Sequence, residues 1–503
     1  MSTSAQFDEL CASAREAALL ESIESLLGWD ERTYMPPAAG EYRAEQMTFL
    51  SGVIHKQRTN PRLGELLGEL AGSSLAKDPH SDAGATVKQL QREYHKRVKL
   101  PQSLVEELTR ASVLGQQAWV KARQDNDFPN FAPHVEKLYA LKREQAKCLG
   151  YADQPYDALL DDYEPDAKTK DVAAVLAGLR SELVPLVQAI MQSGRTAPLE
   201  ILQREYPAAA QEAFGKAAAA AIGFEFSRGR LDVTHHPFCS GMGPHDCRIT
   251  TRYDERFFNT SFFGILHEAG HGIYDQGLRP DQFGLPPGTY LSLGIHESQS
   301  RMWENLVARS RPFWQHFFPQ WQATFPAAAS GVKFDDFYWA VNHVAPSLIR
   351  VEADEATYNL HIIVRFELEQ ALLNQELAVG DLPAAWREKY QQYLGIEPKT
   401  DADGCLQDIH WAAALIGYFP TYSLGNLYAA QFFEQADKDL GGLAAMFARG
   451  EFLPLKQWLN EKIHHRGQRY SSAELVQLVS GKPLSPAPLI RHLRGKLAPL
   501  YGL

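Results

Sequence analysis

Apolar residues recur three and four positions apart through most of the first 222 residues, with charged residues between them. This spacing puts the apolar side chains on one face of an α-helix. Proline follows several of these segments, as expected where helices end. We therefore predict helices over residues 7–27, 85–98, 102–124, 131–149 and 169–193.

The pattern changes between residues 223 and 253, where β-branched and aromatic residues are interrupted by Gly and Pro. Such a composition favours short strands, and we predict a small antiparallel sheet. Helical spacing resumes in residues 262–277 and again in 291–310. The acidic segment 156–165 lacks the glycine of a tight cation-binding loop, so a solvated or rim-lining loop is the favoured interpretation.

These elements predict a mainly α fold. No internal repeat of fixed period divides the chain, and amphipathic helices continue to its C-terminal end. We expect one domain over residues 1–503 with three parts. These are a helical part to about 222, a sheet and metal-site core over about 223–431, and C-terminal helices over about 432–503.

The apolar segment 262–277 contains the pattern H-E-x-x-H, from His267 to His271. Residues four apart on an α-helix lie one turn apart on nearly the same face, so two imidazoles can bind one ion, and zinc accepts imidazole nitrogen readily. Glu268, beside the first histidine, can then take a proton from a metal-bound water. The pattern indicates a metal centre with His267 and His271 as ligands and Glu268 as the catalytic base.

A third ligand is expected from the predicted helix over residues 291–310. We choose Glu297, because two histidines and one glutamate leave the fourth zinc position for water. His296 is the competing candidate, although it points about 100° away round the helix. Asp275 and Glu304 lie one and two turns from the expected ligands, and each is either a carboxylate that orients a ligand or a surface charge.

Charge and cysteine content narrow the function classes. The formal net charge of -11 argues against binding to nucleic acid, which needs a concentrated basic surface. The five cysteines include no C-x-x-C pair, which argues against a disulfide framework and favours a reducing compartment. Cys239 and Cys247 precede the metal helix, so a ligand role has to be considered, but free thiols are the expected state.

Nothing in the sequence has the pattern of a signal peptide or of a membrane span. The first residues are acidic where a signal peptide has a basic region, and no run approaches eighteen consecutive apolar residues. We expect a cytoplasmic protein without a membrane partner.

Six further motifs resemble those of the carboxypeptidase Taq family of metallocarboxypeptidases. They are W-D-E-R-T-Y-M-P-P at 29–37, H-P-F at 236–238, D-x-R-x-T at 246–250, H-E-S-Q at 296–299, I-R-x-x-A-D at 349–354 and the segment 407–431. Together with H-E-x-x-H they run from near residue 29 to the C-terminal region.

The resemblance implies an elongated, gluzincin-like multi-helix fold with a deep groove, a small sheet beside the zinc site and usually a homodimer. It also implies removal of single amino acids from peptides with a free C-terminus, with broad specificity. Zinc is the ion that the resemblance leads us to expect, and cobalt is an ion that often substitutes.

An exopeptidase of this kind needs a fixed cation for the terminal carboxylate of the peptide, and arginine binds carboxylate bidentately. Arg350 is the preferred candidate, with Arg248 assisting. An ion pair between Arg248 and Asp246 is the alternative interpretation of that motif. His236, in the H-P-F element, is a further candidate for substrate binding.

Peptide hydrolysis also needs donors for the oxyanion that forms on the carbonyl. His410, Tyr418 and Tyr422 are available in a segment rich in Gly and Pro. A buried tyrosine hydroxyl often has only a structural partner, so which tyrosine acts is left open.

Two other functions remain open. A zinc oligopeptidase or endopeptidase of similar helical fold would share the metal ligands but need no arginine for a terminal carboxylate. A catalytically silent peptide-binding protein is the third class, and the intact Glu268 argues against it.

Overall fold

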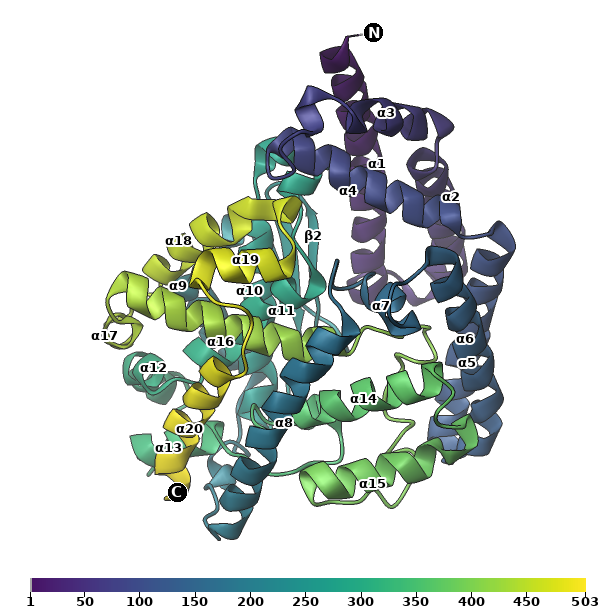
Figure 1. Cartoon of the computed structure of the whole chain (residues 1–503). Coiled ribbons are helices and arrows are strands. Elements are labelled where there is room, and N and C mark those ends of the chain that lie inside the picture. Colours follow the sequence, from purple (N-terminus) through teal and green to yellow (C-terminus); the bar gives the residue numbers. More distant parts are fainter. Residues whose placement is uncertain (1) are drawn as a thin grey trace. The chain divides into compact units, whose positions relative to one another are not determined.

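A computed structural model describes residues 2–503, and Figure 1 shows the chain as ribbons. Contacts between backbone positions divide it into two compact units. Unit 1 comprises Met1–Val98, Pro198–Val341 and Phe432–Lys482, and unit 2 comprises Lys99–Ala197, Asn342–Gln431 and Pro483–Leu503. The expected division into one domain with three parts stays a prediction.

The fold class is confirmed, because 69% of the chain is helical and one small sheet accompanies the helices. The helices predicted in the N-terminal part are all present, each within six residues of its expected ends. They are α1 (Thr3–Thr33), α4 (Asp82–Lys99), α5 (Gln102–Asp125), α6 (Phe128–Leu149) and α8 (Thr169–Gln192). The elongated shape and the deep groove stay predictions.

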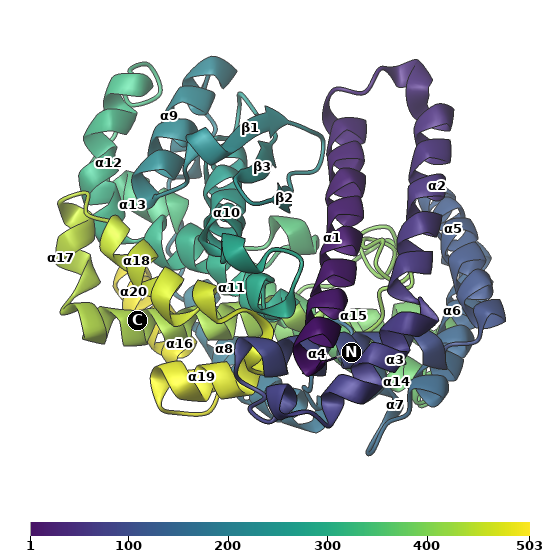
Figure 2. The same cartoon turned by 90° about the horizontal axis from the view of Figure 1, so that it is seen from above.

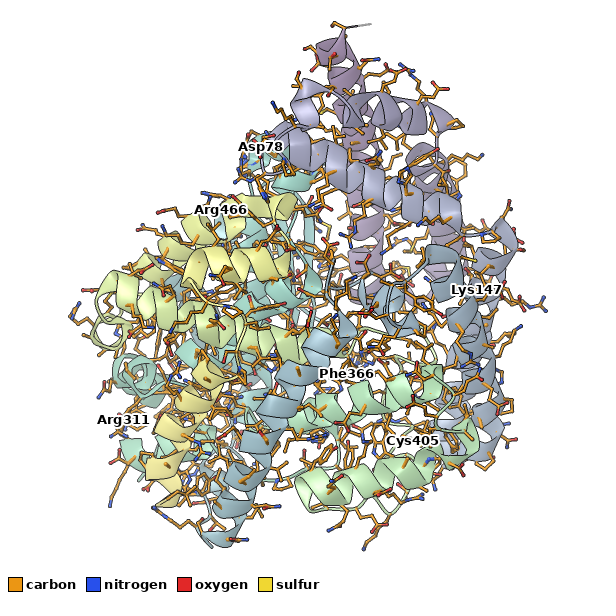
Figure 3. All side chains as sticks on the ribbon, viewed as in Figure 1. Asp78, Lys147, Arg311, Phe366, Cys405 and Arg466 are labelled. Carbon is orange, nitrogen blue, oxygen red and sulfur yellow. The ribbon has the colours of Figure 1, made fainter. Side chains whose placement is uncertain are left out.

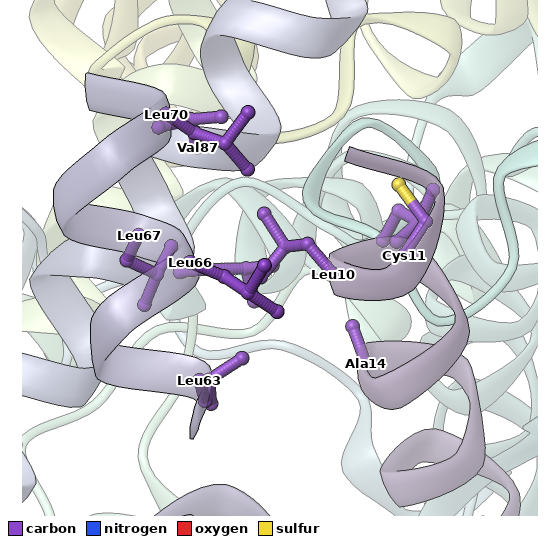
Figure 4. Close-up of a cluster of buried hydrophobic side chains, with 10 residues drawn as sticks. Leu10, Cys11, Ala14, Leu63, Leu66, Leu67, Leu70 and Val87 are labelled. Atoms are coloured by element: carbon purple, nitrogen blue, oxygen red, sulfur yellow. The ribbon is translucent and has the colours of Figure 1, made fainter. Parts of the chain in front are cut away.

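Unit 1 begins with four helices, and α1 and α2 (Gly40–Arg58) run side by side in Figure 2. Buried apolar residues of α1 meet those of α3 (Pro61–Ala71) and α4. Figure 4 shows the result, a cluster of buried side chains from three of these helices. Its labelled members are Leu10, Cys11, Ala14, Leu63, Leu66, Leu67, Leu70 and Val87.

The predicted sheet consists of β1 (Gly229–Val233), β2 (Cys239–Gly243) and β3 (Asp246–Thr251), in the order β1-β3-β2. β2 pairs with β3 in antiparallel fashion, as expected, but β1 pairs with β3 in parallel. The sheet is therefore mixed. β1 and β2 lie on opposite sides of β3, so the residues that connect them cross from one side of β3 to the other.

The helix that follows the sheet, α10 (Phe258–Gly277), is buried on most sides. It packs against β3, α9 (Ala208–Ile222) and α11 (Leu293–Arg301). The predicted helix over 291–310 is present in two pieces, since α11 passes directly into a π-helical turn at Met302–Val307. Ser292 begins α11 by accepting a hydrogen bond from the backbone N–H of Ile295.

Four shorter helices complete unit 1 after α12 (Arg311–Thr324). They are α13 (Phe334–Val341), α17 (Leu443–Ala448), α18 (Leu453–Lys462) and α19 (Ser472–Ser480). The ring of Phe258 lies close to the rings of Trp314 and Trp321, so the N-terminal half of α10 is anchored in an aromatic core.

Unit 2 is built on α5 and α6, which pack together, and on α8. Its other helices are α7 (Pro155–Leu160), α14 (Tyr358–Leu373), α15 (Leu382–Leu394) and α20 (Ala487–Tyr501), while α16 (Pro420–Leu440) has residues in both units. Figure 3 labels Phe366 and Cys405 of this unit, both buried, and Lys147, which points outward from the end of α6.

The expectation of a solvated loop at residues 156–165 is wrong. Five residues of this segment form most of α7 and are buried. Asp157 accepts hydrogen bonds from the backbone N–H and the hydroxyl of Thr169, at 2.7 and 2.5 Å, and so caps the start of α8. The acidic residues misled the interpretation because a capping carboxylate and a solvated one look the same in a sequence.

One helix among residues 2–503, α8, is long and apolar enough to cross a membrane by length and composition alone. A core helix of a soluble protein passes the same test, so the observation is weak evidence. α8 packs against α14, α15 and α20, and a line of its apolar residues is buried there. The absence of a membrane partner stays a prediction.

Candidate metal centre and active site

His267, His271 and Glu297 come together in unit 1, and one ligand atom from each lies within 4.8 Å of the others. Glu297 Oε2 is 3.4 Å from His271 Nε2 and 3.9 Å from His267 Nε2. Ligand atoms that share a tetrahedral zinc lie about 3.3 Å apart, given bond lengths of about 2.0–2.1 Å. The two nitrogens and one oxygen therefore fit a zinc-class ion, and the α10 and α11 positions predicted from the sequence are the ones brought together.

The close approach of α10 and α11 depends on Gly270, within the H-E-x-x-H pattern. A Cβ at this position would lie 2.6 Å from the Cα of Ser300 and 2.7 Å from the carbonyl oxygen of Gln299. Both are backbone atoms of α11, so no side-chain movement would relieve the contact. Gly270 thus lets α11 come near enough for Glu297 to reach the two histidines.

Glu304, in the π-helical turn, orients one of the candidate ligands. Its Oε2 lies 2.9 Å from His267 Nδ1. Because an ionised carboxylate can only accept, the proton of this imidazole is held on Nδ1, and the Nε2 lone pair is left for a metal. Of the two interpretations given for Glu304, the structure supports an orienting carboxylate, since the residue is also buried from solvent on most of its surface.

Arg301 holds both carboxylates, a role that the sequence analysis did not identify. Its guanidinium donates to Glu297 Oε1 at 2.7 Å and to Glu304 Oε2 at 3.2 Å. Burial would raise the pKa of each carboxyl group, but Arg301 and His267 outweigh it, and both pKa values lie below the usual range. Glu297 and Glu304 are therefore ionised at neutral pH, as a metal site requires.

The two histidines differ in their protonation. Burial, followed by the charge of His296, lowers the pKa of His271 to about 4. For His267 burial also lowers the pKa, but Glu297 and the hydrogen bond with Glu304 raise it by more. The pKa of His267 therefore lies above its usual value. A divalent cation would displace the proton from His267 Nε2 and find His271 already neutral.

Glu268 is 7% exposed and lies between the two histidines in sequence. Burial raises the pKa of its carboxyl group to about 7, and the carboxylates of Glu297 and Glu304 add to the rise, against the effect of His267. A carboxyl group whose pKa lies near neutrality is suited to exchange protons with water.

His296, the competing ligand candidate, is turned away from the other donors and bonds with Asp275. Its Nε2 lies 3.2 Å from Asp275 Oδ1, while its ring stacks on that of His271 at 4.4 Å between centroids. Asp275 therefore orients His296 and not a member of the His267, His271 and Glu297 set. The stacking of His296 fixes the plane of the His271 ring.

The two substrate-binding candidates near the sheet lie in unit 1. Arg248 of β3 forms two hydrogen bonds with Asp246, at 2.9 and 2.8 Å, and its guanidinium lies over the ring of Trp29. The ion pair considered as the alternative is therefore present. His236 is exposed in the bend between β1 and β2. Substrate binding by either residue stays a prediction.

The remaining candidates lie in unit 2, around Asp408. Arg350, 6% exposed, donates to Asp408 Oδ1 through Nε and Nη2, at 2.9 and 2.8 Å. Arg365 donates to Asp408 Oδ2 at 2.6 Å. Two guanidinium groups share one carboxylate, so the cluster carries one net positive charge and attracts an anion.

His410, Tyr418 and Tyr422 lie beside this cluster. His410 Nε2 is 3.3 Å from the hydroxyl of Tyr422, and the ring centroids of Tyr418 and Tyr422 are 5.3 Å apart. Burial lowers the pKa of His410 to about 4, and Arg350 adds to the effect against the charge of Asp408. His410 is thus neutral at physiological pH and can donate a hydrogen bond without carrying a charge.

Glu369 of α14 anchors the segment that carries these three residues. Its carboxylate accepts hydrogen bonds from the hydroxyl of Tyr156 at 2.6 Å, from Trp411 Nε1 at 2.9 Å and from the backbone N–H of Gly417 at 3.2 Å. Burial raises the pKa of Glu369 to about 7, although these donors lower it. Two donors from this segment and one from α7 meet at this one carboxylate.

Comparison with known proteins identifies close relatives. The family profile described as carboxypeptidase Taq (M32) metallopeptidase matches residues 9–497. Thermostable carboxypeptidase 1 of Thermus thermophilus is 46% identical over 511 aligned residues, which cover 100% of each chain. Carboxypeptidase 1 of Bacillus subtilis is 39% identical and covers 95% of each chain. A crystal structure of an M32 carboxypeptidase from Deinococcus radiodurans R1 is 40% identical, covers 99% of this chain and 100% of that one, and has a TM-score of 0.96.

Proposed function

The chain belongs to the carboxypeptidase Taq family of metallocarboxypeptidases, and from this premise we propose that it is a zinc-dependent enzyme with broad specificity. It removes single amino acids from the free C-terminus of peptides. The observation that carries the proposal is the convergence of His267, His271 and Glu297 around one point, with Glu268 on the same helix.

His267, His271 and Glu297 would hold the ion, and we infer zinc, with cobalt as a substitute. Nitrogen and carboxylate donors at these separations suit zinc. When bound, such a cation supplies Lewis acidity, which lowers the pKa of water and polarises a carbonyl group. Before an ion binds, Glu304 fixes the orientation of the His267 ring, and Arg301 keeps Glu297 ionised.

Glu268 serves as the base of the reaction. Its carboxylate takes a proton from the attacking water and then gives it to the amine of the departing residue. The pKa of about 7, which burial raises, is poised for both transfers. A nearby divalent cation would lower that value and increase the ionised fraction.

Arg350 is the proposed receptor for the terminal carboxylate of the substrate. Its support is the net positive charge that remains after Arg350 and Arg365 share Asp408. Arg248 and His236 are proposed to assist in binding the peptide. All of these groups recognise charge or backbone, which fits broad specificity.

His410, Tyr418 and Tyr422 are proposed donors to the oxyanion. The neutral state of His410 and its contact with the Tyr422 hydroxyl support hydrogen-bond donation from this segment. The tyrosine that acts directly is not assigned.

The experiment that tests the reaction compares native protein with Glu268→Gln. Both are loaded with zinc to equal content and incubated with a peptide that is blocked at its N-terminus and free at its C-terminus. We expect equal metal content, because Glu268 is not a ligand, and a loss of about a hundredfold or more in the rate of amino-acid release. Equal rates in the two proteins would refute the assignment of Glu268.

A C-terminally amidated peptide of the same sequence distinguishes the main alternative, a zinc oligopeptidase or endopeptidase. A carboxypeptidase should spare the amide, since it lacks the charge that Arg350 would bind. Cleavage of the amide at an undiminished rate would favour the endopeptidase and remove the role proposed for Arg350.

We also propose a cytoplasmic homodimer without nucleic-acid or membrane partners. The five cysteines are free thiols, which suits a reducing compartment. Large apolar side chains are exposed on α1 and α2, among them Leu19, Ile23, Tyr42 and Phe49, and a second copy would cover them. Light scattering across a concentration series should give twice the mass of the chain.

A further inference from the structure

Two thiols and a carboxylate meet in unit 1 at a point separate from the His267, His271 and Glu297 set. Cys239 of β2 and Cys247 of β3 have their sulfur atoms 3.6 Å apart. Asp275 of α10 places Oδ2 at 4.0 Å from each sulfur. One potential ligand atom from each residue lies within 4.8 Å of the others. Cys247 is 3% exposed, so its sulfur atom faces the interior, and Cys239 is partly buried.

The strand register argues against a disulfide between the two cysteines. Cys239 lies opposite Ile249 and Cys247 lies opposite Gly241, so the cysteines are diagonal neighbours on the antiparallel pair. Diagonal Cα atoms are about 7–8 Å apart. A disulfide spans Cα atoms up to about 7 Å apart, with a usual value of about 5.5–6 Å. Forming the bond would therefore require the strands to shift.

The same separation suits coordination of one cation. Two thiolates on a tetrahedral zinc, with bonds of about 2.3 Å, hold their sulfur atoms about 3.8 Å apart. The observed 3.6 Å matches this spacing without any movement of the strands. A thiolate and a carboxylate on the same ion lie about 3.5 Å apart, so a small rotation of Asp275 from 4.0 Å completes the set.

Gly241 makes room for the carboxylate at this point. A Cβ on Gly241 would lie 2.8 Å from Asp275 Oδ2. Without that Cβ, Asp275 reaches across β2 to both sulfur atoms. Asp275 and Gly241 also line a cavity of about 460 Å³ in the same unit, so one member of the cluster borders this cavity.

We propose that Cys239, Cys247 and Asp275 form a second metal site, for one thiophilic divalent cation of the zinc and cadmium class. Three protein ligands leave a fourth position for water. The sulfur donors distinguish the site from the His267, His271 and Glu297 set, which contains none. Soft thiolate ligands favour such cations over magnesium and calcium.

Binding releases protons in a defined number. Each thiol gives up one proton to the solvent as its sulfur joins the cation, so two protons leave for each cation bound, and Asp275 contributes its existing negative charge. No oxidant or reductant takes part. Asp275 keeps Oδ1 for His296 while Oδ2 joins the cation, which links this site to the ring stacked on His271.

Cobalt titration of the full-length, metal-stripped protein under reducing conditions provides the test, because thiolate-to-cobalt charge transfer absorbs in the near ultraviolet and imidazole or carboxylate ligation does not. We expect two equivalents of cobalt, one of which brings the charge-transfer band. Cys239→Ser and Cys247→Ser should each bind one equivalent and lose the band. Cys148→Ser, in α6 of the other unit, is the matched control and should bind two and keep it.

A His271→Ala variant separates the two sites: it should lose one equivalent but retain the band. Absence of a thiolate band from native protein at saturating cobalt would overturn the proposal, as would a band that survives in both serine variants. So would a Cys239–Cys247 disulfide found by peptide mapping of freshly purified protein.

A measurement without substitution guards against variants that fail to fold. Thiols of the metal-stripped native protein are labelled with a maleimide with and without two equivalents of cadmium, which is enough for both sites, and labelled peptides are quantified. Cadmium should slow labelling of Cys239 at least tenfold and leave Cys148 unchanged. Equal labelling of Cys239 in both samples would refute the site.

Discussion

Replacing Gly270 with alanine tests the close approach of α10 and α11 that brings the proposed metal ligands together. The new Cβ would lie 2.6 Å from the Cα of Ser300, where ordinary contact begins at 3.4 Å. The two helices must therefore move apart by about 0.8 Å, whereas metal–ligand distances tolerate about 0.2 Å. Glu297, one turn before Ser300, would move with α11 and away from the histidines.

The free-energy cost of the added methyl group can be estimated from the strain of overpacking, which is about 1–3 kcal/mol. Zinc binding would have to draw the helices back together against this strain. We therefore expect zinc affinity to fall about 5- to 150-fold, as measured by competition with a chelator of known affinity.

Gly264→Ala, in the same helix, is the matched control. Its Cβ would meet only the hydroxyl of Thr251 at 4.0 Å, so there is space for the methyl group. Alanine is a better helix former than glycine, so the free energy of unfolding should rise by about 0.5–1 kcal/mol with zinc affinity unchanged. If Gly270→Ala binds zinc as tightly as Gly264→Ala and the native protein, the helix spacing does not control the site.

Three further predictions concern the metal site and a buried carboxylate. Glu304→Gln removes the charge that holds the proton on His267 Nδ1, and we expect a loss of zinc affinity of about 10- to 100-fold; unchanged affinity in chelator competition would contradict this role. Removing the metal with a chelator should abolish peptide hydrolysis, and added zinc should restore it; hydrolysis by protein shown to be metal-free would contradict the proposed function. The pKa of Glu369 is about 7 in the folded chain and 4.5 when the residue is exposed. Between these pH values the unfolded chain has lost a proton that the folded chain keeps. The free energy of unfolding therefore falls as pH rises, by about 3 kcal/mol in all. Denaturation of native protein and Glu369→Gln at several pH values should show a fall that is larger in the native protein by about 3 kcal/mol, and parallel pH curves would refute it.

Much of the structure could be predicted from helix periodicity and from the local spacing of residues. The helices of the N-terminal part and the helix bearing His267 and His271 were predictable because each buries one apolar face. The three proposed ligands were predictable because their order along two consecutive helices limits the donors that can meet. Their convergence in the structure follows from Gly270, a residue whose presence in the sequence had no assigned meaning.

Other features depend on contacts that no local pattern records. The parallel pairing of β1 with β3 depends on the path of the chain between strands. Asp157 is buried because Thr169 supplies two donors, and Arg301 acts because two carboxylates flank it on one helix. The free cysteines were expected, but the meeting of Cys239, Cys247 and Asp275 depends on a diagonal strand register.

The π-helical turn at Met302–Val307 makes this part of the chain sensitive to insertions and deletions. Such a turn holds one more residue than an α-helical turn. A single deletion there would restore the α-helical ladder, so residues after the turn would keep their orientation while residues within it, Glu304 among them, would be turned relative to Glu297. Glu304 would then lose His267 even though every metal ligand remained in place. A one-residue gap at this point in a related sequence therefore marks a change in how the ligand histidine is held.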